Sequence, residues 1–379
     1  MKNICRKVMV RAYSKIRHLS NKRYTIVERL CCKIYKLRKI SGEDIKINGL
    51  FAECDKGLRL PGILVDILGK KNRRLKSNAR CLSGCYIDFY AKTAQCIIEI
   101  TIGNYIEINH MTSFGTSGVD MYIINNKSAY IWKGCYVPNY YGKVRINVGK
   151  NCNMREGTRI RIYFPMFVSV SDIRVFIDSN AEYMETLQSE EAVCFYGSSI
   201  TQGCAASRPG LSYPALVGRY LNCPIYNLGF SESAHGEEQI ADWIGKQKFR
   251  CIVVEYDHNA SLDMFRDTHY RFYKVIRQNN KNALIIFLSR ASIRMTITYN
   301  EYIERKSIIK DTISRACLAG DDRIQYIDGY IIFGDGLLSD YFVDGKHPND
   351  RGMLTIAEKI VEKIIECEKN NTNVYEGFI

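Results

Sequence analysis

The hydrophobic pattern of residues 41–185 is that of an all-β domain. Short stretches of β-branched and aromatic residues alternate with polar ones or run together, and turns rich in Gly, Asn and Lys separate them. They lie at residues 85–90, 94–102, 119–124, 130–137, 143–148 and 158–164. Several short strands at this spacing predict a sandwich, jelly-roll-like in arrangement. We interpret a basic run at 70–74, early in this region, as a solvated loop.

From about residue 186 the pattern changes, and short apolar runs alternate with longer amphipathic stretches. The apolar runs predict buried strands at 193–196, 224–228, 251–256, 284–289 and 324–327. The amphipathic stretches predict helices near 212–221, 236–247, 262–279, 298–319 and 350–368. This alternation predicts a mostly parallel sheet with helices on both faces. We therefore expect a three-layer α/β/α domain over residues 186–379.

Residues 1–40 form a third region, which is distinguished by its charge. Thirteen Lys or Arg stand against one acid, Glu28, so this arm carries +12 of the net +14 of the chain. Its apolar residues recur at helical spacing in two stripes: Ile4, Val8, Ala12 and Ile16, then Ile26, Val27, Leu30, Ile34 and Leu37. Three interpretations stay open: a solvated arm, a segment lying on an anionic membrane surface, or a docking segment for an acidic partner. We do not expect nucleic-acid binding, because no motif for it accompanies the charge.

Composition narrows the class of protein. No run of about eighteen apolar residues is present, so we expect no transmembrane helix. Basic residues interrupt the first apolar stretch, so we expect no secretory signal. Fifteen scattered cysteines then indicate reduced thiols and a cytoplasmic protein, peripheral to the membrane if the arm binds one. Cys81 and Cys85, like Cys31 and Cys32, lack partners at metal-binding spacing, so we predict neither a metal nor a cofactor.

Polar residues gather where the predicted parallel strands end. A Gly-Ser-Ser turn at 197–199 follows the first strand, residues 227–231 follow the second, and 256–260 follow the third. A fourth stretch, 344–349, comes just before the last helix. The carboxyl ends of parallel strands meet at one edge of the sheet, where ligands bind. Each stretch alone is most simply a turn or a helix cap, but the four together supply the groups that acyl transfer needs.

Acyl transfer through a serine needs a base, a carboxylate and donors for an oxyanion. An imidazole takes the proton of the serine, and a carboxylate holds that imidazole in one tautomer. Asp344 and His347 can pair locally, and Asn259 with the N–H groups of Gly229 and Ser199 can surround the oxyanion. Because the base must be neutral, we expect kcat/KM to rise with pH through one ionisation near or somewhat above about 6.5.

At these residues the chain resembles the SGNH (GDSL-type) hydrolases, over roughly residues 186–368. Residues 197–203 are similar to the first block of that family, and Ser199 matches its nucleophile. Ser198 stands where the name-giving Asp of the family is usual, which leaves two adjacent serines to choose between.

The resemblance also implies the remaining roles. Gly229 and Asn259 match the Gly and Asn of the oxyanion hole, to which the N–H of the nucleophile contributes, and Asp344 and His347 match the Asp-x-x-His block. Asp257 departs from the family, which often has Gly at this place. These matches imply a Ser–His–Asp triad that works through an acyl-enzyme.

A narrower likeness covers both domains. Residues 110–122 resemble the β-sandwich module that precedes one bacterial branch of these hydrolases, and 204–210 and 212–214 resemble the same branch. The resemblance implies a serine esterase that removes acetyl groups from carbohydrate. Arg208 and His235 are candidates for contacting the substrate, although Arg208 could instead fix its own loop. The alternatives are an O-acyltransferase with the same triad and a carbohydrate-binding protein without chemistry. The oligomeric state stays open.

Overall fold

The computed structural model describes residues 37–41, 45–55, 57–104, 106–125, 128–140, 142–186, 191–292, 297–334 and 338–376. The predicted basic arm therefore lies outside the described residues, except for its last four. These open strand β1 (Leu37–Ser41), which pairs antiparallel with a strand of the sandwich. None of the described helices combines the length and the apolar content that a membrane span needs.

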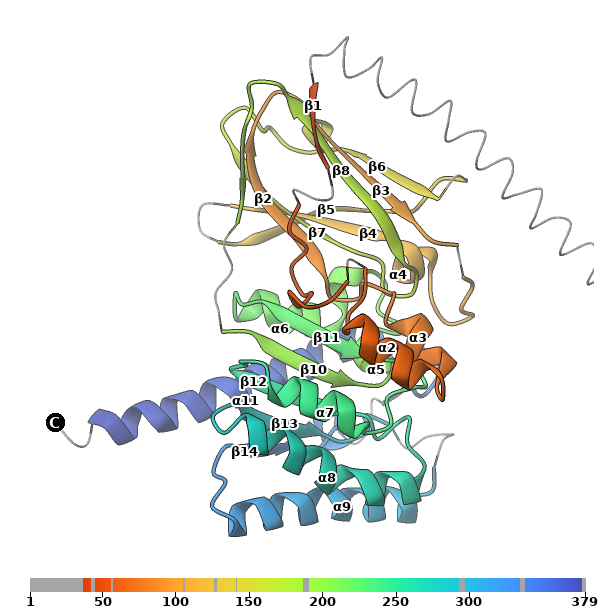
Figure 1. Cartoon of the computed structure of the whole chain (residues 1–379), viewed down its shortest axis with the longest axis vertical. Helices are drawn as coiled ribbons and strands as arrows, with labels where there is room; N and C mark the ends of the chain where they lie inside the picture. Colours follow the sequence, from red (N-terminus) through yellow and green to blue (C-terminus); the bar gives the residue numbers. More distant parts are fainter. Residues whose placement is uncertain are drawn as a thin grey trace, which may run out of the picture.

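The N-terminal region is an antiparallel β-sandwich (Figure 1), as the sequence predicts. Within the described residues, one sheet has the order β1, β8 (Val170–Asp178), β3 (Cys96–Ile102), β6 (Lys143–Asn147). The other has the order β5 (Tyr130–Tyr136), β4 (Val119–Ile124), β7 (Thr158–Tyr163), β2 (Tyr86–Lys92), β9 (Glu182–Glu185). A short helix α4 (Ser113–Ser117) precedes β4, and a 3-10 turn η1 (Val148–Lys150) follows β6. Inward-facing residues of both sheets form one core, in which Ile98, Ile100, Ile160, Ile162 and Val175 are completely buried.

The prediction of a solvated loop at 70–74 holds for 70–72, an outward-facing turn, but not for Arg73 and Arg74, which begin a helix. This run joins two helices, α2 (Gly62–Gly69) and α3 (Arg73–Asn78), which precede the first long strand of the sandwich. The side chain of Asn72 accepts a hydrogen bond from the N–H of Leu75 at 3.1 Å and caps α3, while Leu75 itself is fully buried. The charge pattern concealed this helix, because its basic residues are exposed around a single buried leucine.

The C-terminal domain has the predicted three-layer α/β/α architecture. Its parallel sheet has the order β11 (Ile225–Gly229), β10 (Val193–Gly197), β12 (Cys251–Glu255), β13 (Leu284–Leu288), β14 (Ile324–Ile327). The helices are α5 (Ser199–Gln202), α6 (Tyr213–Tyr220), α7 (Glu238–Gly245), α8 (Leu262–Asn279), α9 (Tyr299–Leu318), α10 (Leu338–Tyr341) and α11 (Asp350–Glu376). Two 3-10 turns, η2 (Pro209–Leu211) and η3 (Ile331–Phe333), complete it. Strand β10 lies between β11 and β12, so the chain first continues from β10 to one side of the sheet and then crosses to the other side. A ligand site is expected at the carboxyl end of β10, where this change of direction occurs.

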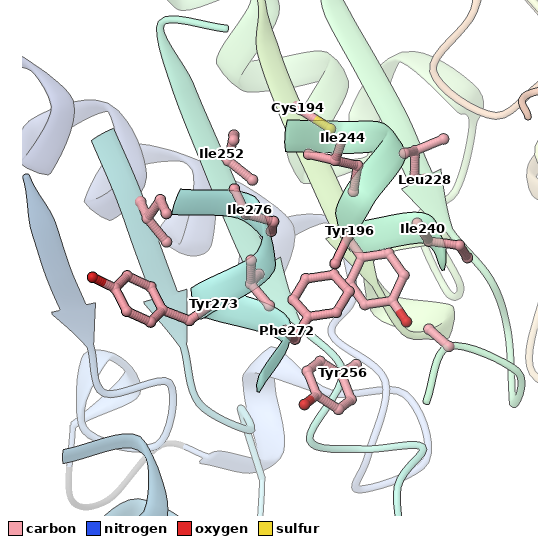
Figure 2. Close-up of a cluster of buried hydrophobic side chains, with 14 of the residues drawn as sticks. Cys194, Tyr196, Leu228, Ile240, Ile244, Ile252, Tyr256, Phe272, Tyr273 and Ile276 are labelled. Carbon is pink, nitrogen blue, oxygen red and sulfur yellow. The ribbon is translucent and has the colours of Figure 1, made fainter. Parts of the chain in front are cut away.

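Strand residues alternate between two buried layers of this sheet. Tyr196 and Ile252 face α7 and α8 (Figure 2), where Tyr196 stacks on Phe272 with ring centroids 4.5 Å apart. Their neighbours Phe195 and Val253 face the opposite layer, which α6 and α11 cover. Both faces of every central strand are therefore apolar, which fixes the register and rigidly positions the loops at the strand ends.

Candidate active site

The nucleophile turn begins where β10 ends. Gly197 is the last residue of the strand, and a Cβ there would collide with Thr201 Oγ1 and the carbonyl oxygen of Glu255. Ser198 is the N-cap of α5, and its hydroxyl accepts a hydrogen bond from the N–H of Ile200 at 3.1 Å. A glycine followed by a capping serine thus makes the tight strand-to-helix turn, and Ser199 becomes the first residue of the helix.

The structure brings Ser199, His347 and Asp344 together in one chain of hydrogen bonds. Ser199 Oγ lies 2.9 Å from His347 Nε2, and His347 Nδ1 lies 2.7 Å from Asp344 Oδ2. The other carboxylate oxygen, Oδ1, accepts from the backbone N–H groups of His347 at 2.7 Å and Lys346 at 3.0 Å. The backbone of the turn before α11 therefore holds the carboxylate of Asp344, and this carboxylate in turn holds the imidazole of His347. This is the geometry of a Ser–His–Asp triad.

The surroundings set the charges of the two acid–base groups. Burial raises the pKa of Asp344, but the hydrogen bonds from the side chain and backbone of His347 outweigh it and lower that pKa to about 2. Burial also lowers the pKa of His347 below its ordinary value; the Asp344 carboxylate opposes this shift, and the charges of His110 and Lys346 add to it. At neutral pH the structure therefore holds an ionised carboxylate beside a neutral imidazole, which can accept a proton.

The direction of this shift corrects the expected pH dependence. A base whose pKa is lowered stays neutral further into the acid range, so kcat/KM should rise with pH through an ionisation below, not above, the ordinary histidine value of about 6.5. The measurement is kcat/KM on a soluble aryl ester between pH 4 and 9, after control incubations show that the enzyme stays folded. A single acid limb centred above pH 7 would contradict the effect of burial on His347.

The second serine of the turn points into the protein. Ser198 Oγ donates to Glu255 Oε2 at 2.7 Å, and the same carboxyl oxygen accepts from Thr201 Oγ1 at 2.9 Å. Glu255 is the last residue of β12, and burial raises its pKa to about 7. The sequence interpretation missed this residue, although a carboxylic acid ending an apolar strand was a visible signal. Since Ser198 is engaged with Glu255, Ser199 is the hydroxyl presented to the imidazole.

The oxyanion donors differ from the prediction at one position. The N–H of Gly229 donates to the side-chain oxygen of Asn227 at 2.8 Å, so it is not available to an oxyanion. The reason is local, because an Asn side chain readily folds back onto the N–H two residues later. In the described part of the chain, the N–H of Ser199 has no hydrogen-bond partner. Asn259 Nδ2 donates to the carbonyl oxygen of Phe230 at 3.0 Å, which orients its amide and leaves its second hydrogen for a ligand.

A different backbone N–H of the same loop is available in place of that of Gly229. Glu232 has a φ of 54° in the turn after β11, and no described residue accepts a hydrogen bond from its N–H. Helix α3 fixes this turn: Asn78 Nδ2 donates to the carbonyl oxygen of Ser231 at 2.8 Å, and Arg74 pairs with the carboxylate of Glu232. Sequence reasoning could not find this residue, because glutamate seldom adopts a left-handed conformation. Ser199 N–H, Glu232 N–H and the second amide hydrogen of Asn259 are therefore the candidate donors for an oxyanion.

Asp257, the departure from the family pattern, is an anchor for the loop that carries Asn259. Its Oδ1 lies 3.2 Å from Arg290 Nε and 3.0 Å from Arg305 Nη1, and all three side chains are almost fully buried. The two guanidinium groups also donate to the carbonyl oxygen of Asp257. This network ties the loop after β12 to the start of α9 and to the end of β13.

Removal of this carboxylate should destabilise the fold strongly. Asp257→Ala takes one partner from two buried guanidinium groups, a loss that typically lowers the free energy of unfolding by about 3–5 kcal/mol. Asp263→Ala is the matched control, because Asp263 pairs with Arg266 on the surface and is 89% exposed. Such an exposed pair contributes about 0–1 kcal/mol. Urea unfolding followed by circular dichroism measures both; equal stability of the two variants would show that the network contributes little.

The two residues predicted to contact substrate have other partners. Arg208 Nη1 donates to Asp120 Oδ2 at 2.6 Å and to the hydroxyl of Tyr122, and its guanidinium lies 4.6 Å from the ring centre of Trp132. These contacts favour the other interpretation of Arg208, as a residue that fixes its loop, here against the sandwich. His235 is half-buried, and its backbone N–H donates to Glu237 Oε1 at 3.1 Å. Neither contact joins these side chains to the triad.

A third group, supplied by the sandwich, was not expected at the site. His110 lies on the loop before α4, with its Nε2 3.0 Å from Cys204 Sγ and its ring stacked on that of His347. The donor atoms of His110, Cys204 and His347 lie within 4.8 Å of one another, and His–Cys–His is a donor set that suits zinc. No sequence signal could link them, because His110 and Cys204 are 94 residues apart.

Comparison with known proteins agrees with this geometry. Residues 190–366 match the model of the GDSL-like Lipase/Acylhydrolase family. Residues 42–183 match the GxDLY module, described as the N-terminus of Esterase_SGNH_hydro-type proteins. The chain belongs to the GDSL-like hydrolase family and carries its N-terminal GxDLY module. In this GDSL-like hydrolase the motif reads Gly-Val-Asp-Met-Tyr at 118–122, and its Asp120 and Tyr122 are the partners of Arg208.

Solved structures support the two-domain fold of this GDSL-like hydrolase. A Bacteroides ovatus protein described as a GDSL-like lipase has a TM-score of 0.76 at 20% identity, over 87% of this chain and 98% of that one. A salicylyl-acyltransferase of a tetracycline biosynthetic pathway has a TM-score of 0.72 at 14% identity, over 88% and 98%. An acetyl xylan esterase from the rumen bacterium Butyrivibrio proteoclasticus has a TM-score of 0.60 at 12% identity, over 88% and 99%. No curated protein matches the sequence significantly.

Proposed function

We propose that this GDSL-like esterase removes O-acetyl groups from carbohydrate. The observation that carries the proposal is the complete relay from Ser199 through His347 to Asp344, set beside donors for an oxyanion. Carbohydrate is supported by two distant likenesses of the whole fold. One is the acetyl xylan esterase, and the other is a family two carbohydrate esterase solved with cellohexaose, at a TM-score of 0.55 and 14% identity.

In the proposed mechanism the relay moves one proton in each half of the reaction. His347 Nε2 takes the proton of Ser199 Oγ as the hydroxyl attacks the ester carbonyl, and Asp344 stabilises the imidazolium that forms. The N–H groups of Ser199 and Glu232 and the amide of Asn259 hold the oxyanion. His347 returns the proton to the leaving sugar hydroxyl, which releases the alcohol and leaves an acetyl-enzyme. Water then repeats the sequence and frees acetate.

The experiment is a comparison of esters by mass analysis of the products. Acetylated xylan and cello-oligosaccharides, a long-chain acyl ester and an aryl acetate are supplied in turn, and free acetate and deacetylated sugar are the expected products. Turnover of the long-chain ester alone would overturn the assignment of substrate. A fluorophosphonate label that reacts with Ser199 would exclude the third alternative, a carbohydrate-binding protein without chemistry.

An acyltransferase is the second candidate, and the likeness to the salicylyl-acyltransferase supports it. The same triad serves both reactions, because only the acceptor of the acyl-enzyme differs: a hydroxyl of an alcohol or sugar replaces water. The discriminating measurement adds acceptor sugar to a reaction with labelled acetyl donor. Transfer of label to the sugar at the expense of free acetate identifies the transferase, whereas acetate alone identifies the esterase.

For the basic arm we propose reversible binding to anionic membranes. The arm carries +12, and each base near an anionic surface contributes about 1 kcal/mol, which salt screens. Full-length protein should therefore sediment with anionic vesicles at low salt and not at high salt, while a variant without residues 1–36 should stay in solution with unchanged aryl-ester turnover. Equal sedimentation of both proteins, or of neither, would contradict this role of the arm and a location at the membrane surface.

A further inference from the structure

A side chain of the β-sandwich, that of His110, reaches into the catalytic centre. His110 lies with its ring almost parallel to that of His347, at an interplanar angle of 8° and a centroid separation of 4.6 Å. Its Nδ1 is 3.8 Å from Asp344 Oδ2, the same oxygen that holds the Nδ1 of His347. One residue of the first domain therefore contacts two members of a triad built entirely by the second.

The loop that carries His110 is docked firmly beside the nucleophile. The thiol of Cys204 lies 3.0 Å from His110 Nε2, and the N–H of Cys204 donates to the carbonyl oxygen of Ser199 at 2.8 Å. Thr112 Oγ1 donates to the carbonyl oxygen of Ser207 at 3.2 Å. A Cβ at Gly115 would lie only 2.6 Å from the carbonyl oxygen of Ala206, so the two backbones are in close contact. The ring of His110 is thus held at Nε2 by Cys204 and by its own docked loop.

We propose that His110 is a positioning residue, which packs against the face of His347 and keeps that imidazole in line with Ser199 Oγ and Asp344 Oδ2. The role rests on the proposed acyl transfer. The two triad hydrogen bonds fix His347 at Nδ1 and Nε2, but they leave the ring free to tilt about the line between those bonds. A parallel ring against one face restricts that tilt. Misplacement of a catalytic group by about 1 Å can lower a rate 100-fold, so the restraint matters for turnover.

The stack has a second consequence, for the charge of the base. A proton on His110 would repel a proton on His347 and attract Asp344, so His110 contributes to the lowered pKa of His347, after burial. The titratable groups that face His347 come from several elements: Asp344, Lys346, His110, Cys204 and His258. Asp344 raises the pKa of His347, whereas His110 and Lys346 lower it, and His110 is the group supplied by the sandwich.

The geometry favours this stack over a metal centre. A metal ion lies close to the plane of each imidazole that binds it, and two parallel rings have no common point in their planes. Both nitrogen atoms of His347 are also engaged, by Ser199 and by Asp344. Zinc binding would therefore require the two rings to turn and the hydrogen bonds of the triad to break. Treatment of the enzyme with a chelator tests for such binding.

The test compares three substitutions at His110 with one neighbouring control. His110→Ala removes the packing and the charge, His110→Phe keeps a flat ring without the charge, and His110→Gln keeps polarity without the ring. Thr112→Ala is the control, because it weakens the same docked loop without touching His347. The readouts are kcat and KM on an aryl acetate, the pH profile of kcat/KM, and the rate at which a fluorophosphonate labels Ser199.

We expect His110→Ala to lower kcat by about 10- to 100-fold with a smaller change in KM. His110→Phe should recover most of kcat, yet its acid limb should move to higher pH, because a repelling charge has gone while the packing stays. Thr112→Ala should keep the wild-type pH profile. The labelling rate of Ser199 should follow kcat in all variants, whatever the natural ester is.

Three results would overturn the role of His110. Unchanged kcat and pH profile in His110→Ala would show that the stack contributes nothing to turnover. A loss of kcat in Thr112→Ala as large as that in His110→Ala would show that His110 acts only by docking its loop. Activation of the purified enzyme by a chelator, absent in His110→Phe, would assign the residue to an inhibitory metal site. Failure of the proposed function is distinguishable, because the wild type would then neither turn over esters nor label at Ser199.

Discussion

Replacement of Ser199 by alanine should lower kcat by at least three orders of magnitude. Ser199 Oγ is the group that His347 Nε2 faces at 2.9 Å, and loss of a triad serine leaves only the catalysis that substrate binding and the oxyanion donors provide. The measurement is kcat on an aryl acetate, with the protein concentration of both enzymes fixed by absorbance. Circular dichroism should show an unchanged fold, because the one hydrogen bond of Ser199 Oγ among the described residues is that to His347.

The adjacent serine is the matched control for this substitution. Ser198→Ala removes the cap of α5 and the hydrogen bond to Glu255, which should lower the free energy of unfolding by about 1 kcal/mol. Most of the activity should remain, since Ser198 does not face the imidazole. If Ser198→Ala were inactive and Ser199→Ala active, the nucleophile would be misassigned by one position.

Replacement of Asp344 by asparagine should have an effect of similar size. The carboxylate accepts from His347 Nδ1 at 2.7 Å, and it fixes the tautomer that leaves Nε2 free to accept a proton. An amide in its place favours the wrong tautomer, a change that lowers kcat about 10⁴-fold in a Ser–His–Asp enzyme. The pKa of Asp344 is lowered to about 2, so the wild type keeps this carboxylate ionised over the whole working range of pH.

Asp350 provides the control for the carboxylate. It accepts a hydrogen bond from the N–H of Ser207 at 2.7 Å, at the start of α11, and it makes no contact with His347. Asp350→Asn should keep kcat within a few-fold of the wild type at pH 8. A loss in Asp350→Asn as large as in Asp344→Asn would indicate that the whole turn, and not the relay, controls turnover.

The sequence by itself determined the two domains and the core of the relay. Alternation of apolar and polar residues over 41–185 requires a half-buried sheet, and the apolar runs after 186 require a buried parallel one. Asp344 and His347 could be paired from the sequence because their contact is local, made within one turn before a helix. Interactions of this short range depend on residue type and spacing, and both are printed in the sequence.

Only the tertiary structure decided the rest of the site. The turn that carries the N–H of Glu232 is held by α3, which packs on it through Asn78. Ser198 is turned inward by Glu255, which lies on a different strand. His110 meets His347 across a domain interface. These contacts join residues far apart in the chain, so their geometry depends on how whole elements pack and not on the pattern within any one of them.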